Sequence, residues 1–447
     1  MSGARCAAAL AVMTIVACRA AEPTPWSDAW LAREAERYLG PTAHRRAALE
    51  ASLVNPDNVY SRQRLKSYGR DTVGWDALPV WNPRSRPIDR AAADELARRV
   101  WPQVGTARLW DGRRPTSQAA WIELGRRVFF EYPLRAELGA EHALMPWSAD
   151  RPLAVDAVAT AAALGIERTP AGDLPGLVVF DDVDGARRVG ITCAICHTAI
   201  RDGVVVAGAA RRRFDLGRLR LDYFRDTGAA VDAELARRMA TWGPGRADVT
   251  EDDDEDPVAI PDLWGLRAEG FLTQAGTIRQ VGPAALAIRQ ETQLLHANGL
   301  RIRPPRELAW ALAMYLYALE PPPIATRVSN PRGATLFDAH CRRCHANEIH
   351  GGDPMPVEQV GTDPSLANGR ARGTGRYRIA PLVRVVDGAP YLHDGSVPTL
   401  DALLSADRLA PDFTGGARGP GPIHGHAYGL ELAAADRAAL IAYLASL

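Results

Sequence analysis

Lysine is almost absent from this 447-residue sequence. Lys66 is the only one, and arginine supplies the other basic residues. The 53 basic residues are balanced by 53 acidic ones, so the formal net charge is zero. A chain without net charge has no overall field that draws it to nucleic acid or to an acidic membrane. We therefore expect no nucleic-acid partner.

Long apolar runs are also missing. The N-terminal run from Cys6 to Ala17 is apolar apart from Thr14, and it is too short for a stable transmembrane helix. It ends before Cys18, in an order that resembles the lipobox of bacterial lipoproteins. We expect residues 1–18 to be a signal peptide with lipid attached at Cys18. Ordinary signal cleavage and a retained apolar anchor are the alternatives. Each of them exports the chain, which predicts a periplasmic or cell-envelope lipoprotein.

Cysteine is scarce as well, with six residues in all. Two lie near the N-terminus, and the others belong to two C-x-x-C-H units: Cys193, Cys196 and His197, then Cys341, Cys344 and His345. Cysteines at i and i+3 share one face of a helical turn, so both thiols can reach the vinyl groups of one porphyrin. The adjacent histidine then faces the iron, which is the c-type haem attachment pattern. A zinc site would need ligands from both units, and a redox dithiol needs no trailing histidine. The two units therefore predict two covalently bound haem c groups.

The sequence around the two units repeats. A glycine, two residues, an apolar residue and a phenylalanine occur in Glu123–Glu131 and again in Pro331–Asp338, each ahead of a C-x-x-C-H unit. Apolar-periodic segments that end Tyr-Leu-x-x-Leu close the two halves, at Glu307–Leu319 and Asp436–Leu447. An N-terminal helix crossed by a C-terminal helix, with haem between them, is the cytochrome c plan. Consecutive prolines after Glu320 end the first half.

These patterns predict a mainly α fold. We expect two tandem cytochrome c-type haem domains, at 119–322 and 323–447, behind an N-terminal helical and irregular extension at 19–118. The chain length agrees with more than one domain. The extension shows helical patterns at Ser27–Leu39 and Ala91–Val100 and carries no motif. We expect it to pack over the first haem domain.

One later segment is more specific. Ala389-Pro-Tyr-Leu-His-Asp-Gly-Ser-Val-Pro-Thr-Leu400 resembles the signature of bacterial dihaem cytochrome c peroxidases and their relatives, the methylamine-utilisation dihaem enzyme and the dihaem rubber oxygenases. Leu124–Phe130 resembles the first helix of that family, and the likeness spans Trp121 to Leu447. Gly361–Pro364 and Gly425–Gly429 are more similar to the rubber-oxygenase branch. The resemblance implies a reactive N-terminal haem and a six-coordinate, electron-transferring C-terminal haem.

The second haem departs from the peroxidase pattern. Peroxidases hold the electron-transfer haem with a late distal methionine, whereas the last methionine here is Met355, too close to His345 to wrap around the porphyrin. The resemblance to rubber oxygenases implies His426 as the distal ligand. His424, Tyr428 and an open or water-bound site are the alternatives. A histidine in place of methionine lowers the haem potential, which weakens the peroxidase interpretation.

At the first haem, the family implies a tryptophan between the haems and a glutamate that acts on peroxide. Gln274 stands where the tryptophan is expected, and Trp264 is either an aromatic bridge or a packing residue. Glu291 is the candidate distal acid, with a solvated helix position as the alternative. His393, within the signature, is expected to make a structural hydrogen bond rather than bind iron. The acidic run 250–256 lacks the ligand pattern of an EF-hand loop, so we expect a solvated loop there, and calcium between the domains stays undecided.

Three functions remain open. The first is a peroxidase-like enzyme that reduces hydrogen peroxide at the His197 haem with electrons relayed through the His345 haem. The second is a dihaem oxygenase that acts on an organic substrate with dioxygen, and the third is a dihaem electron carrier without enzymatic activity. The long stretch before the second haem favours an enzyme. Expected partners are the small-molecule oxidant and an electron-donor protein such as a small cytochrome or a cupredoxin.

Overall fold

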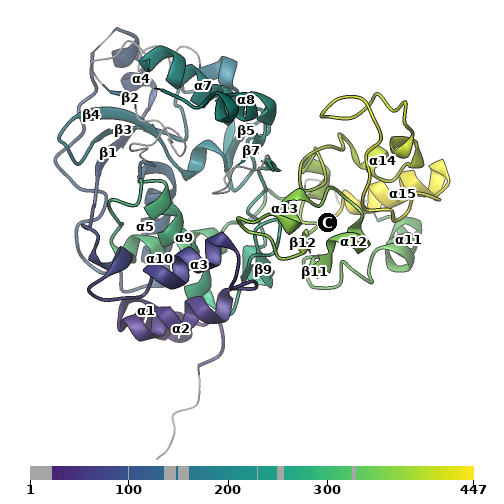
Figure 1. Ribbon diagram of the computed structural model, residues 1–447, viewed down its shortest axis with the longest axis horizontal. Coiled ribbons are helices and arrows are strands. Elements are labelled where there is room, and N and C mark those ends of the chain that lie inside the picture. Colours follow the sequence, from purple (N-terminus) through teal and green to yellow (C-terminus); the bar gives the residue numbers. More distant parts are fainter. Residues whose placement is uncertain are drawn as a thin grey trace, which may run out of the picture.

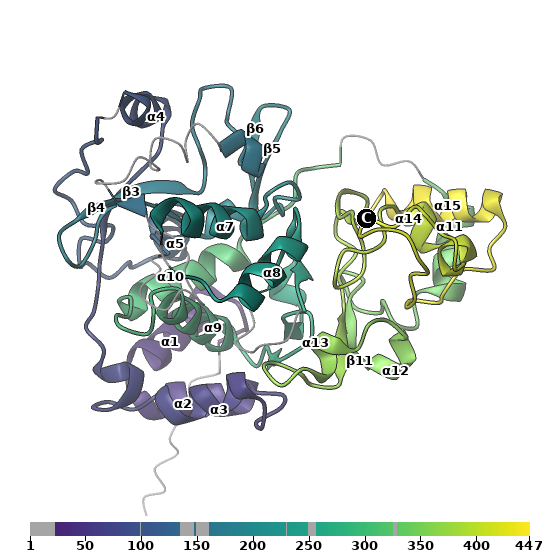
Figure 2. The same ribbon diagram turned by 45° about the horizontal axis from the view of Figure 1, so that its top comes forward.

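The computed structural model describes residues 23–98, 100–134, 147–148, 161–228, 230–248, 256–324 and 329–447. Figure 1 shows two lobes, a larger one that contains the chain up to α10 and a smaller one that contains α11 to α15. Helices are the main regular structure, as the sequence predicts. The lobes are joined between α10 and α11 (Figure 2), and four residues of this connection, 325–328, lie outside the described ranges. The domain boundary at 322/323 stays a prediction.

A pair of packed helices forms the centre of each lobe. The sequence predicts all four helices, the second of each pair from its apolar periodicity and the first from the repeated glycine-phenylalanine pattern. The larger lobe pairs α5 (Gln118–Glu131) with α10 (Arg306–Tyr317), and the smaller lobe pairs α11 (Pro331–His340) with α15 (Ala434–Leu444).

A glycine sits at the contact point of each helix pair. A Cβ atom on Gly125 would overlap the carbonyl oxygen of Ala311, and a Cβ atom on Gly333 would overlap the carbonyl oxygen of Ala439. Only glycine permits such a close approach of two backbones. The glycine of the repeated sequence pattern is therefore explained by helix packing in both lobes.

A matched aromatic pair lies beside each glycine. Phe129 packs against Tyr315 with ring centroids 5.3 Å apart, and Phe337 packs against Tyr443 with ring centroids 5.4 Å apart. Both pairs are tilted, at 56° and 48°. The phenylalanine and tyrosine of the repeated pattern thus meet in the same way in the two lobes.

The N-terminal extension belongs to the larger lobe, because its apolar residues join the same hydrophobic core. Its first helix begins at the Ser27 cap, whose side chain accepts from the Trp30 amide. The elements of the extension are α1 (Asp28–Leu39), α2 (Thr42–Ser52), α3 (Val59–Ser67), η1 (Gly74–Ala77), β1 (Arg84–Pro87) and α4 (Arg90–Ala97).

The extension also reaches the smaller lobe. The side-chain amides of Asn55 and Asn58 donate to the carbonyl oxygen of Gly373, at 2.8 and 3.2 Å. The backbone amide of Tyr60 donates to the carbonyl oxygen of Ala371 at 2.9 Å. The extension therefore holds the two lobes together, beyond the covering role that the sequence predicts.

A four-stranded antiparallel sheet precedes the first C-x-x-C-H unit, in the order β1-β3-β4-β2. The sequence does not predict it, because its strands are short and β1 comes from the extension. Besides β1, the strands of this sheet are β2 (Trp147–Ser148), β3 (Leu177–Asp181) and β4 (Arg187–Ile191).

The remaining elements of the larger lobe surround this sheet and the helix pair. The short helices are η3 (Ala161–Leu164), η4 (Cys193–Ile195) and η5 (Leu266–Ala268), and the long ones are α7 (Leu216–Thr227), α8 (Ala233–Trp242) and α9 (Pro283–His296). Three two-stranded sheets pair β5 (Thr198–Arg201) with β6 (Val204–Ala207), β7 (Arg246–Ala247) with β8 (Val258–Ala259), and β9 (Phe271–Leu272) with β10 (Ile278–Arg279).

The smaller lobe fills the space around its helix pair with short elements. They are β11 (Gly352–Pro356), α12 (Val357–Val360), α13 (Ser365–Asn368), β12 (Arg376–Ile379), η6 (Val385–Asp387), α14 (Leu400–Leu403) and η7 (Ala406–Leu409). Strand β12 borders the larger lobe, where the amide of Arg378 donates to the carbonyl oxygen of Gln274 at 2.8 Å and its guanidinium pairs with Glu269. Within the described ranges, every helix is too short or too polar to cross a bilayer.

Candidate functional site

A cavity of about 300 Å³ lies where the two lobes meet, and it contains the second C-x-x-C-H unit. Its lining is mainly apolar. From the smaller lobe it takes Cys341, Cys344, His345 and His426, and from the larger lobe Gln274 and Trp264 among others. Such a site, apolar with a few polar groups that converge, is typical of a cofactor pocket.

The local backbone brings the two cysteines to this cavity. Helix α11 ends at His340, and the amides of Cys344 and His345 then donate to the carbonyl oxygen of Cys341, at 3.1 and 3.0 Å. This helical turn puts both thiols on one side. Burial raises the pKa of the Cys341 thiol to about 11, so it stays neutral.

His345 is oriented by a backbone carbonyl. Its Nδ1 atom lies 2.6 Å from the carbonyl oxygen of His350, a residue with φ of 52°. A hydrogen bond from Nδ1 leaves Nε2 as the nitrogen that can bind a metal ion. Burial lowers the pKa of His345, which favours the neutral, ligating form.

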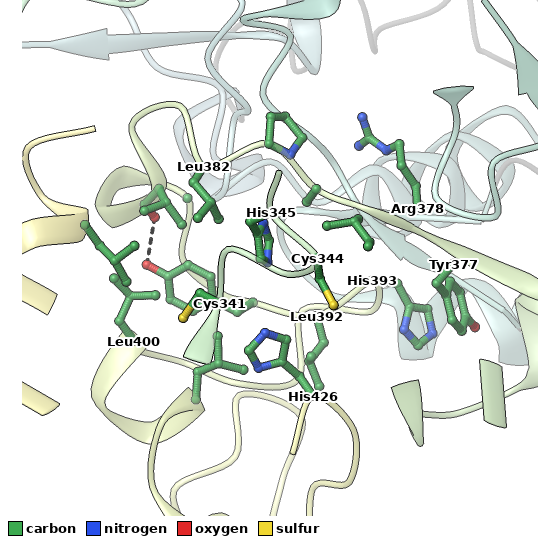
Figure 3. A pocket seen from close by; sticks show the side chains of 18 of the residues that line it. Cys341, Cys344, His345, Tyr377, Arg378, Leu382, Leu392, His393, Leu400 and His426 are labelled. Carbon is green, nitrogen blue, oxygen red and sulfur yellow. Dashed lines mark hydrogen bonds between the residues drawn. The ribbon is translucent and has the colours of Figure 1, made fainter. Parts of the chain in front are cut away.

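His426 faces His345 across the cavity. Figure 3 shows the two rings on opposite sides of the space that Cys341 and Cys344 border. Burial, helped by the nearby His345 and Arg408, lowers the pKa of His426 to about 4, so this imidazole is also neutral. Its Nδ1 atom is buried without a hydrogen-bond partner in the described part of the chain.

The other ligand candidates at this site are placed differently. His424 is exposed and lies outside the cavity lining. Tyr428 and Met355 both line the cavity, and the Tyr428 hydroxyl lies 3.7 Å from the Met355 sulfur. The geometry thus brings the sequence-predicted His426 to the cavity, with Met355 as a neighbour.

The first C-x-x-C-H unit has the same local geometry. The amide of His197 donates to the carbonyl oxygen of Cys193 at 3.3 Å, and His197 Nδ1 lies 3.1 Å from the carbonyl oxygen of Pro261. Burial raises the pKa of Cys193 and of Cys196 to about 12 and lowers the pKa of His197 to about 4. Both units therefore present two cysteines and one neutral imidazole whose Nε2 is available.

These residues fit haem c better than the alternatives. A redox dithiol needs thiols with a lowered pKa, whereas burial raises the pKa of Cys193, Cys196 and Cys341. The four cysteines of the two units are free thiols rather than disulfides. A zinc ion needs about four ligands, and no described cluster of three or more His, Cys, Asp or Glu residues is arranged for a metal ion.

Glu291 does not stand in an open distal pocket. Its carboxylate is buried and accepts hydrogen bonds from the Tyr38 and Tyr68 hydroxyls at 2.7 and 2.8 Å. Its other oxygen lies 3.4 Å from Arg306. Both tyrosines come from the extension, so Glu291 ties the extension to α9. The expectation of a solvated helix position is wrong, and the geometry gives a peroxide-acid role no support.

Gln274 and Trp264 are the two candidates for the bridge between the units. Both line the cavity of the second unit from the larger lobe. The Gln274 amide lies 3.5 Å from the carbonyl oxygen of Ala259. Trp264 is buried and donates to the carbonyl oxygen of Ala207 at 3.1 Å, on the hairpin that follows His197. Trp264 thus contacts both the cavity of the second unit and the hairpin that follows the first unit.

The Ala389–Leu400 signature forms a tight turn on the cavity wall. Tyr391 and Val397 pair through their backbones, and Asp394 accepts from the Ser396 amide at 3.1 Å. His393 stacks on Tyr377 with ring centroids 4.3 Å apart. The carbonyl oxygen of His393 accepts a structural hydrogen bond from the Ala259 amide at 2.8 Å, and the His393 ring is held by stacking.

Several expectations fall on residues outside the described ranges. The signal segment with Cys18 lies there, as does nearly all of the acidic run 250–256. They stay predictions.

Comparison with protein families finds a match in the smaller lobe. Residues 376–411 match a family described as RoxA-like, cytochrome c-like. The matched segment contains β12, the signature turn and α14, which together form much of the cavity wall. A cytochrome c-like segment implies covalently bound haem c, and it indicates a haem-containing redox protein. No curated protein matches the chain.

Sequence reasoning missed three residues that shape these sites. Pro261 and His350 supply the carbonyl oxygens that orient the two histidines, and Arg408 supports the loop of His426. A backbone carbonyl has no sequence signature, and a single arginine among many carries no signal.

Proposed function

We propose that this chain is an exported c-type dihaem oxidoreductase. In this proposal the His345 site carries a six-coordinate electron-transfer haem, and a small oxidant reacts at the His197 site. The observation that carries the proposal is the cavity with His345 and His426 on opposite sides and two cysteines at its border (Figure 3). Haem c supplies an iron that exchanges one electron and, where an axial position is open, coordinates a small oxidant.

The two sites differ in whether a second histidine faces the histidine of the C-x-x-C-H unit. The second site has His426 opposite His345. Between His197 and Pro321 the sequence has one histidine, His296, whose ring packs edge-on against Trp75 with ring centroids 5.4 Å apart. A haem with an open axial position is suited to bind an oxidant, and a haem closed by two ligands is suited to pass electrons with little change in geometry.

Hydrogen peroxide is the first candidate oxidant. Cleavage of its O–O bond needs a residue that moves a proton. Glu291, the expected one, is held by Tyr38 and Tyr68. A peroxidase function therefore needs another proton source at the His197 site.

Dioxygen with an organic substrate is the second candidate. Two observations favour it: the RoxA-like match over residues 376–411, and the position of His426, which the resemblance to rubber oxygenases implies. The electron donor in either case would be a small cytochrome or cupredoxin, and lipid on Cys18 would attach the protein to the membrane.

The ligand assignment is tested with His426→Ala. One low-spin haem should become high-spin and open to cyanide, because its second imidazole is gone. Met355→Leu is the matched control, since Met355 lines the same cavity. An unchanged low-spin signal in His426→Ala, or its loss in Met355→Leu, contradicts the assignment.

Haem number and location need two further measurements. Replacing Cys341 and Cys344 with serine should remove half of the covalent haem stain, and replacing Cys193 and Cys196 should remove the other half. Cyanide should bind the wild-type protein at the His197 site alone. Binding at the His345 site reverses the roles, and two sites closed to cyanide would indicate an electron carrier.

Measurements of peroxide consumption and of dioxygen uptake distinguish the two candidate oxidants. Consumption of peroxide with a reduced donor supports the peroxidase, and dioxygen uptake that depends on an apolar organic substrate supports the oxygenase. Lipid attachment is tested separately by palmitate labelling, which Cys18→Ser should abolish. Labelling that survives this change refutes lipid attachment at Cys18 and leaves export intact.

A further inference from the structure

The loop that carries His426 has an uncommon backbone. Gly425 has φ of 104° and His426 has φ of 48°, so two consecutive residues lie in the left-handed region. A residue with a side chain adopts this conformation only where its surroundings enforce it. Gly425 is itself confined, because a Cβ atom there would meet Thr362. The loop needs support from outside its own sequence.

Arg408 supplies that support. It is fully buried, and its Nη2 atom donates to the carbonyl oxygens of Gly425 and His426 at 2.6 and 3.1 Å. Nη1 donates to the carbonyl oxygen of Ile423, and Nε donates to that of Leu403 at 3.2 Å. Leu403 ends α14 and lines the cavity. One side chain therefore fastens the His426 loop to the cavity wall.

The chemistry of this contact is specific to arginine. A buried charge is costly, and among the described residues Arg408 has no carboxylate within ion-pair distance, so ion pairing does not explain its place. The guanidinium presents five N–H donors in a rigid fork, which can serve several carbonyl oxygens at once. A lysine at this position would present a single charged nitrogen.

We propose that Arg408 is a positioning residue for His426. Its hydrogen bonds hold the loop in the left-handed conformation that turns the imidazole into the cavity, opposite His345. The inference rests on the proposed function, since it takes His426 as the ligand that closes the second site. Arg408 itself acts only through the loop backbone.

Loss of the guanidinium should free the loop. Hydrogen bonds from a charged donor are among the stronger ones, and here two of them hold the two left-handed residues. In Arg408→Gln, the ratio of molecules with His426 bound at the second site to molecules with this position open should therefore fall about tenfold or more. The open fraction should be high-spin and should bind carbon monoxide faster once reduced.

The experiment compares Arg408→Gln, Arg408→Lys and His426→Ala with the full-length wild-type protein carrying its haems. Arg437→Gln is the control, because Arg437 is an arginine of the same lobe that pairs with the exposed Asp401. The readouts are the high-spin fraction, the rate of carbon monoxide binding, and the recovery of the low-spin spectrum on addition of free imidazole. Imidazole recovery separates a lost ligand from a collapsed site.

Both Arg408 variants should have a larger high-spin fraction, and free imidazole should return this fraction to the low-spin state. The high-spin fraction of the Arg437→Gln control should stay as in the wild type. If His426→Ala opens the site while both Arg408 variants stay closed, the positioning role is refuted and the ligand assignment stands. If His426→Ala leaves the spectrum unchanged, the ligand assignment itself fails. Should Arg408→Gln fail to fold, Arg408→Lys and Gly425→Ala, which disturbs the same loop against Thr362, decide the matter by the same readouts.

Discussion

His197 Nδ1 lies 3.1 Å from the carbonyl oxygen of Pro261, and Pro261 also lines the cavity that contains the second C-x-x-C-H unit. One residue is therefore in contact with the histidine of the first unit and with the cavity of the second. Trp264, three residues later, lines the same cavity and donates to Ala207 on the hairpin after His197. The segment that contains Pro261 and Trp264 is the structural connection between the two units.

Trp264→Leu should slow electron exchange between the two sites, because it removes the aromatic ring that contacts both the cavity of the second unit and the hairpin after His197. Trp264→Phe should slow it less, since a ring remains. Stopped-flow absorption after reduction by a donor would measure the exchange. Trp242→Leu, a buried tryptophan on α8 that does not line the cavity, is the control. Equal exchange rates in Trp264→Leu and the control would show that Trp264 only packs.

Gly333→Ala should destabilise the protein by about 1–3 kcal/mol, because the added methyl group overlaps the carbonyl oxygen of Ala439. Gly125→Ala should do the same in the larger lobe. Gly270→Ala is the matched control, since a Cβ atom there meets nothing within 4 Å. Denaturant unfolding of the three variants gives the comparison. A cost at Gly270 equal to that at Gly333 would contradict the helix-crossing explanation.

The helices at the centre of each lobe could be predicted because their information is local. Apolar residues recur at helical spacing, and the glycine-phenylalanine pattern occurs twice. The attachment units are equally local, since five consecutive residues carry the whole signal. The sheet was missed because β1 pairs with β3 from far along the chain, and short strands carry little periodicity.

The role of Glu291 could not be predicted for a different reason. Its helix is buried on more than one side, so spacing alone does not show which neighbour a polar residue meets. The partners, Tyr38 and Tyr68, are 253 and 223 residues away in the sequence. Only the folded arrangement brings the extension over α9.

Glu291→Gln should lower the free energy of unfolding by about 1–3 kcal/mol, because an amide cannot replace the carboxylate that accepts from Tyr38 and Tyr68 and faces Arg306. Oxidation activity per folded molecule should change little. Denaturant unfolding and turnover, each normalised to haem, measure the two effects. Glu358→Gln, at an exposed position, is the control. Unchanged stability with activity lowered about 10²–10⁴-fold would restore Glu291 as a proton donor.

Asp394 should make stability depend on pH. Burial alone would raise its pKa, but His393, Ser396 and Arg418 outweigh burial and hold the pKa of Asp394 below its ordinary value. A group whose pKa is lowered by folding stabilises the protein above its unfolded pKa, and this contribution is lost as the pH falls through the folded pKa. The effect should therefore be present at pH 7 and fade below about pH 4.

Asp394→Asn should cost about 1 kcal/mol of unfolding free energy at pH 7, and wild type and variant should converge in acid. Denaturant titrations at pH 7 and pH 3 would show this convergence. Asp412→Asn, an exposed aspartate of the same lobe, should show no such trend. A difference between Asp394→Asn and wild type that persists unchanged in acid would contradict the ionic contribution.

The cavity of the second unit has walls from Arg212 to Leu444, so it exists only once both lobes are in place. The extension, through Asn55 and Asn58, fastens those lobes to each other. In the proposed function, a porphyrin joined to Cys341 and Cys344 would occupy this cavity. We therefore expect the thioether bonds to form while the lobes are still apart, so that packing of the two lobes completes the walls around the cofactor.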